Sequence, residues 1–145
     1  MCVIVTTTPN SAGVITPSFV MADDGELLSA LATRESSVDG LLRSKRMADA
    51  LQTSLSDPPV ASKSADVKKK YAMLVLKVIA AVDDKQIDDV LSPLDLDTCD
   101  ILMKYVYKGL ESPDQSTQLL KWHAKLLDKV GLGAVVRVMA DRKTV

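Results

Sequence analysis

Aromatic residues are scarce in this sequence of 145 residues: phenylalanine, tyrosine and tryptophan together make up only 3% of it. The core must therefore be built from aliphatic side chains, alanine and methionine, and hydrophobic residues make up 47% of the chain. Strands favour β-branched and aromatic residues, whereas an alanine-rich aliphatic composition favours helices. The composition therefore favours an all-α fold over a β-sandwich, and the length is enough for one domain with a hydrophobic core.

Residues that carry chemistry are also rare. The two cysteines, Cys2 and Cys99, lie far apart, and His123 is the single histidine. This count predicts neither a disulfide framework nor a metal site, and we expect no cofactor and a reducing compartment. Cys99 is interpreted as a small buried residue and His123 as a hydrogen-bonded core residue, because neither has an activating partner nearby in the sequence. On these residues a structural role is favoured over a catalytic one for both Cys99 and His123.

The chain also lacks an excess of charge of either sign, with 18 basic and 19 acidic residues. The formal net charge is −1, which provides no overall positive field for binding nucleic acid or an anionic membrane. No apolar run approaches the roughly 20 residues of a membrane-spanning helix. The run Lys68–Lys70 is ordinarily a solvated helix face, and a salt-dependent contact with an acidic partner is the alternative. We therefore expect neither a nucleic acid nor a membrane as partner.

The first 22 residues carry no charged side chain. They are not interpreted as a targeting signal, because the apolar run CVIV is short and no basic residue precedes it. We predict that residues 1–35 form a flexible N-terminal segment. Met21 is a candidate start of the chain, in which case residues 1–20 are an optional extension.

From Ser36 onward the pattern is helical, and we predict an all-helical core domain over residues 36–145. Ser36 and Asp39 have the spacing of a helix N-cap, and Asp97 with Asp100 is a second expected N-cap pair. Apolar periodicity and the positions of proline and glycine predict helices over residues 47–55, 65–82, 83–91, 97–109, 113–130 and 133–145. The last segment has a β-branched run, but with no partner strand elsewhere a helix is favoured.

These elements predict helical hairpins stacked as an α–α superhelix behind an extended N-terminal tail. No repeat of fixed period is apparent in the sequence. Along the helix over 113–130, the leucines and Val130 are expected to face inward, and Lys121, Lys125 and Lys129 outward.

Several helices have apolar residues outside their expected core faces. At about 100° per residue, Tyr107 points away from the core face of its helix, which consists of Ile101, Leu102, Tyr105 and Val106. Met103 lies beside it, Trp122 lies on the edge of its helix, and Met73 and Leu76 lie on the back of the helix over 65–82. Either other helices of the domain cover these side chains, or they form a protein–protein interface, where such residues are enriched. The candidate interface residues are Met103, Lys104, Tyr107, Lys108 and Trp122.

Several stretches closely resemble one known family. The segments LMKYVYKGLESP (102–113), LLKWHAK (119–125) and GAVVRVMADRKTV (133–145) are similar to motifs of subunit five of the actin-related protein 2/3 complex, its smallest subunit. DALQTSLSDPP and the middle of the chain match as well, so that the resemblance runs in unbroken order from about residue 38 to residue 145.

The resemblance implies a non-catalytic structural subunit of the complex that nucleates branched actin filaments, in the cytoplasm and the actin-rich cell cortex. It implies contacts with the β-propeller subunit and subunit four, and an N-terminal segment that reaches the actin-related protein 2 subunit. Here the acidic part of that segment is reduced to ADDGE, which puts the last contact in question, and the loop DQSTQ after Pro113 is shorter than usual.

Two further functions stay open on the residues alone. A free-standing helical adaptor would bind peptides or helices in a groove between hairpins. A small enzyme using His123 is the weaker alternative.

Overall fold

The computed structural model describes residues 24–59, 62–141 and 145. This part of the chain contains α-helices, two 3₁₀ turns and no strand. The elements in chain order are α1 (Asp24–Arg43), α2 (Met47–Leu55), α3 (Ala65–Ala81), η1 (Asp84–Gln86), α4 (Ile87–Leu91), α5 (Leu96–Leu110), η2 (Pro113–Gln115), α6 (Ser116–Val130) and α7 (Leu132–Ala140).

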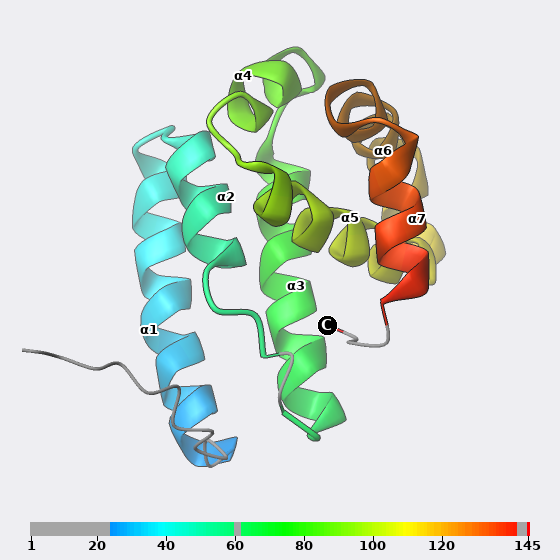
Figure 1. Cartoon of the computed structure of the whole chain (residues 1–145). Helices are drawn as coiled ribbons and strands as arrows, with labels where there is room; N and C mark the ends of the chain where they lie inside the picture. The colour runs from blue at the N-terminus through cyan, green and yellow to red at the C-terminus, as the bar shows by residue number, and fades with distance from the viewer. Residues whose placement is uncertain (1–23, 60–61, 142–144) are drawn as a thin grey trace, which may run out of the picture.

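Figure 1 shows α1, α2 and α3 side by side, with α1 and α2 as a hairpin. Helix α3 also packs on α5, and α5 packs on both α6 and α7. The predicted all-α fold of stacked helical hairpins is thus confirmed. The expected N-terminal tail falls mainly on residues 1–23, which lie outside the described residues.

Helix α3 packs on α1 and α2 on one side and on α5 on another, because it is apolar over much of its circumference. Its buried face consists of Val67, Tyr71, Ala72, Leu74, Val75, Val78 and Ile79. Tyr71 and two side chains from later helices, Tyr105 and Trp122, are the largest that are fully buried. The opposite side of α3 leaves Met73 exposed, and Leu76 is half-buried.

Helix α1 is longer than the sequence predicted. It runs through Ser36 without interruption, so the expected helix start there and the boundary between residues 35 and 36 both fall inside a helix. The reason is a continuous inner stripe in which Leu31 and Val38 are buried. Arg34 fits into this stripe because its guanidinium lies 5.3 Å from the ring centroid of Tyr71 and donates to the carbonyl of Ser56.

The start of α5 also differs from the prediction. Asp95, not Asp97, is the N-cap, and its side chain accepts a hydrogen bond of 3.0 Å from the backbone N–H of Thr98. Hydrogen bonding by the side chain of Thr98, and then by its backbone N–H, lowers the pKa of Asp95 below its usual range. The expected helix over the C-terminal segment is confirmed as α7.

A row of lysines joins α6 to the preceding pair η1 and α4. Lys121 pairs with Asp84, and Lys125 pairs with Asp88 at 2.7 Å. The Nζ atom of Lys129 donates to backbone carbonyls at the end of α4, including that of Leu94 just beyond it at 2.8 Å. These lysines face outward from the apolar side of α6 as predicted, and they fix α6 parallel to α4.

Candidate interaction surface

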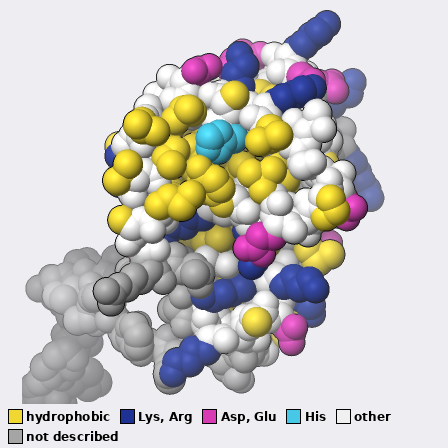
Figure 2. All heavy atoms as spheres, turned by 90° about the vertical axis from the view of Figure 1, so that its right-hand side faces the viewer, with side chains coloured by type: hydrophobic (Ala, Val, Ile, Leu, Met, Phe, Trp, Pro, Cys, Tyr) yellow, Lys and Arg dark blue, Asp and Glu magenta, His cyan; other side chains and the backbone are white. Residues whose placement is uncertain are grey.

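Helices α6 and α7 present a continuous apolar surface (Figure 2). We call it the α6–α7 surface, and its large exposed residues are Leu120, Leu132, Val136 and Met139. Each of these four side chains is more than half exposed, from 57% for Leu120 to 70% for Leu132. Isolated exposed apolar residues are common, but a gathered patch of this kind marks an interaction site.

His123 lies in the middle of this apolar patch (Figure 2). Its Nε2 atom is 2.9 Å from the hydroxyl of Tyr107 on α5, and the two rings meet edge to face with centroids 5.4 Å apart. This hydrogen-bonded pair joins α6 to α5 and is a polar group within the apolar patch. His123 is thus hydrogen-bonded as predicted, but it is half-buried at the surface and not inside the core.

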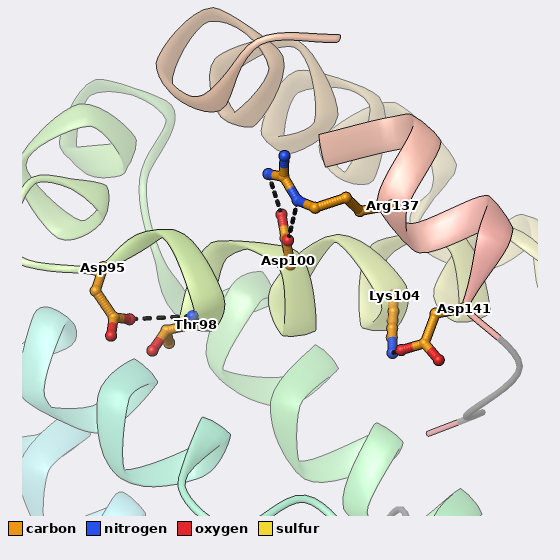
Figure 3. Close-up of polar contacts among 6 residues, drawn as sticks. All are labelled: Asp95, Thr98, Asp100, Lys104, Arg137 and Asp141. Atoms are coloured by element: carbon orange, nitrogen blue, oxygen red, sulfur yellow. Dashed lines mark hydrogen bonds and ion pairs between the residues drawn. The ribbon is translucent and has the colours of Figure 1, made fainter. Parts of the chain in front are cut away.

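Two ion pairs hold α7 against α5 (Figure 3). The guanidinium of Arg137 donates from Nε and Nη2 to the two carboxylate oxygens of Asp100, at 2.6 and 3.0 Å. This bonding raises the pKa of Arg137, so its side chain stays charged. Lys104 donates to Asp141 just after the end of α7. Because α7 carries most of the exposed apolar residues, these pairs fix the shape of the α6–α7 surface.

Two of the five candidate interface residues prove to be core residues. Met103 and Trp122 are 0% exposed, so their expected exposure was wrong. Helix α5 packs on α2, α3, α6 and α7, and α6 packs on α4, α5 and α7. With neighbours on several sides, neither helix leaves these side chains uncovered. The alternative that other helices of the domain cover them is therefore the correct one for Met103 and Trp122.

The other three candidates lie nearer the surface. Tyr107 packs against α6, and Lys104 is largely covered by its contact with Asp141. The ammonium of Lys108 is exposed and lies 2.9 Å from Glu111 in its own helix region. Both Tyr107 and Lys104 therefore contact another element of this chain, and whether they also contact a partner stays a prediction.

The four exposed residues of the α6–α7 surface were missed by the sequence reasoning. Leu120 was expected to face inward, but it is 57% exposed. For α7, the available signal was composition: LGAVVRVMA is apolar on more than one side of a helix of nine residues. A terminal helix packed on a domain from one direction must leave its other apolar side outward.

Other kinds of site find no support in the described part of the chain. No group of three histidine, cysteine, aspartate or glutamate side chains gathers there in a geometry for holding a metal ion. Among the helices of residues 24–59 and 62–141, none combines the length and the hydrophobicity needed to cross a bilayer. The chemistry that this surface offers is apolar contact around one polar pair.

Comparison with known proteins identifies the family of this chain. The family model for the ARP2/3 complex 16 kDa subunit (p16-Arc) matches residues 15–145. Actin-related protein 2/3 complex subunit 5 of Dictyostelium discoideum is 38% identical over 122 residues, which cover 84% of this chain and 88% of that protein. The subunit 5-C of Xenopus laevis is 42% identical over 113 residues, covering 77% and 75% of the two chains. The human subunit 5-like protein is 42% identical over 112 residues, covering 76% and 73%. The chain belongs to the p16-Arc family of ARP2/3 complex 16 kDa subunits.

Proposed function

We propose that this chain is a non-catalytic structural subunit of an actin-related protein 2/3 complex, where it supports the nucleation of branched actin filaments. Its membership of the p16-Arc family supports this role, because its relatives carry the names of subunits of that complex. The actin-rich cell cortex is its expected location.

The observation that carries the proposal is the α6–α7 surface. Exposure of these four large apolar side chains to water is unfavourable, and their burial by a partner would stabilise the complex. Full burial of such a side chain contributes roughly 1.5–3 kcal/mol. We propose that the β-propeller subunit covers this surface, with subunit four beside it.

The N-terminal segment is the second expected contact. We propose that the residues before α1 reach the actin-related protein 2 subunit, as the resemblance implies. Of the acidic stretch ADDGE, residues 24–26 form the first turn of α1, so the proposed segment ends where this helix begins.

The experiment is reconstitution of the complex with charged replacements on the surface. We expect Met139→Asp and Val136→Asp to reduce incorporation of the chain by more than about tenfold, because each places a charge in an apolar interface. Met73→Asp is the matched control: Met73 is 61% exposed and Met139 66%, but Met73 lies on α3. Equal incorporation of all three variants and the unmodified chain would rule out the α6–α7 surface as the interface.

The two alternative functions have less support. A free-standing adaptor would act without sister subunits, yet the relatives named above are all subunits of one complex. An enzyme based on His123 would need a second functional group in reach. In the described residues His123 is bonded to Tyr107, and no acidic residue is recorded as its partner.

A further inference from the structure

A groove of about 900 Å³ lies between α3 and the junction of α5 with α6. Its apolar lining includes Met73 and Leu76 of α3 and Leu119 of α6, and Gly109 of α5 forms part of its floor. None of the four large exposed residues of the α6–α7 surface lines this groove. The groove is therefore a separate feature that the proposed subunit contact leaves unexplained.

The outer row of α3 gives the groove its length. The residues of α3 that line it extend from Ala65 to Ala80, a rise of about 22 Å at 1.5 Å per residue. Alanines at both ends and Ala72 between them permit a close approach, and Met73 is long, unbranched and adaptable. A helix of about four turns has the matching length.

Lysines dominate the charges that line the groove. Four lysines line it, Lys68, Lys69, Lys77 and Lys108, together with two acidic side chains, Glu111 and Asp114, and the chain end at Val145. Lys77 pairs with Asp39 at 2.7 Å and Lys108 with Glu111 at 2.9 Å. Lys69 is exposed, and no ion pair of the described residues includes it. An apolar floor with a basic edge is complementary to an acidic amphipathic segment.

We propose that this groove binds an amphipathic α-helix of a transient partner protein, with apolar side chains on one face and acidic side chains along one edge. Apolar side chains of this helix pack on Met73 and Leu76, and its acidic edge lies along Lys69. This proposal goes beyond the structural role proposed above and involves different residues.

The size and charge of the groove favour a transient partner over a permanent subunit. A single helix laid in one groove gives an interface at the low end of the range for protein complexes, where weak and transient contacts are found. The exposed position of Lys69 makes its contribution sensitive to salt.

A photo-crosslinking residue in place of Met73, in the full chain within the assembled complex, tests the occupant. With irradiation at about 50 mM salt we expect a crosslink to an acidic amphipathic segment of another protein, and we expect a wash at about 500 mM salt before irradiation to prevent that crosslink. The proposal is overturned by a crosslink to a second copy of this chain, to residues 1–23, or to a subunit that resists the wash. Absence of any crosslink in complexes isolated at low salt overturns it as well.

A synthetic peptide with the sequence of the crosslinked segment then tests the chemistry. We expect Lys69→Glu to weaken its binding by about tenfold or more, with a smaller loss for Met73→Ala. Lys85→Glu is the control, because Lys85 is an exposed lysine that does not line the groove. Equal affinities for Lys69→Glu and Lys85→Glu would overturn the proposal. Met139→Asp should leave peptide binding unchanged, so failure here is distinct from failure of the subunit contact.

Discussion

Gly109 of α5 lies directly against Leu76 of α3. A Cβ atom added to Gly109 would stand 2.6 Å from Cδ2 of Leu76 and 2.8 Å from Cδ1 of Leu119. Real side chains do not approach so closely, so the absence of a side chain at Gly109 allows α3, α5 and α6 to meet.

The first prediction concerns this contact. We expect Gly109→Ala to lower the free energy of unfolding by about 1–3 kcal/mol, because Leu119 is fully buried and has little room to move. Gly40→Ala is the matched control: Gly40 lies inside α1, and beyond the neighbouring backbone of that helix nothing comes within 4 Å of the added Cβ. Its free energy of unfolding should rise by about 0.5–1 kcal/mol, because alanine has a higher helix propensity than glycine. Chemical denaturation measures both, and a loss of stability in both variants would contradict the assignment.

The second prediction concerns the ion pair between Asp100 and Arg137. We expect Asp100→Asn to increase hydrogen exchange in α7 several-fold and to leave α1 and α2 unchanged, because the pair joins α5 to α7 alone. Asp89→Asn provides the control, since Asp89 is exposed on α4. Unchanged exchange in α7 would show that apolar packing alone positions this helix.

The third prediction concerns two tyrosines of α5. The hydroxyl of Tyr105 is buried and has no hydrogen-bond partner among the described residues. An unpaired buried hydroxyl is costly, so Tyr105→Phe should raise the free energy of unfolding by about 1 kcal/mol. The hydroxyl of Tyr107 is hydrogen-bonded to His123. Tyr107→Phe should therefore lower the free energy of unfolding by about 0.5–1.5 kcal/mol.

Tyr105 also gives the protein a dependence on alkaline pH. Burial raises the pKa of Tyr105 above its ordinary value near 10. Below about pH 10 the hydroxyl is protonated in both the folded and the unfolded chain, so the free energy of unfolding does not depend on its titration. As the pH rises further, the unfolded chain releases this proton first, and the free energy of unfolding falls. Tyr105→Phe should lose less stability above about pH 10 than the unmodified chain. Identical alkaline profiles would contradict the burial of this hydroxyl.

The fourth prediction concerns Cys99, which is free and buried. Burial raises the pKa of its thiol and hides the sulfur from reagents. In a Cys2→Ser variant, we expect Cys99 to react with a thiol reagent at pH 8 only as fast as the protein opens. Denaturant should restore the rate of a free thiol. Rapid labelling of the native chain would show that Cys99 is accessible.

Most helices could be predicted from the sequence because their apolar periodicity is local. The predicted core face of α5 is largely confirmed: Leu102, Tyr105 and Val106 are 0% exposed. The extent of α1 could not be predicted, because Arg34 looks polar in the sequence. It fits the inner stripe through Tyr71, Ser56 and Asp57, which lie in later segments.

The interaction surface was harder to predict for the same reason. Periodicity showed that α5 and α6 have apolar residues on several sides, but not which neighbours cover them. Burial of Met103 and Trp122 depends on the way α6 and α7 pack on α5. The exposed side of α7 follows from the same arrangement, which no local pattern specifies.

Four ion pairs between helices share one sequence separation. Asp84–Lys121 and Asp88–Lys125 join α4 and its 3₁₀ turn to α6, and Asp100–Arg137 and Lys104–Asp141 join α5 to α7; the separation is 37 positions in every case. On α1 and α3, Asp39 and Lys77 are 38 positions apart. Helices α1, α4 and α5 are thus each joined to a helix about 37 residues further along the chain, and the two ion pairs of α6 and of α7 show that these two helices run parallel to their partners.

This constant separation means that the protein has a spatial repeat where its sequence shows none. Repeat proteins are stabilised by contacts between adjacent units and not by likeness of the units themselves. Here charged residues at matching positions join successive units. The described helices therefore form a short solenoid, and the four ion pairs at a separation of 37 positions give its period.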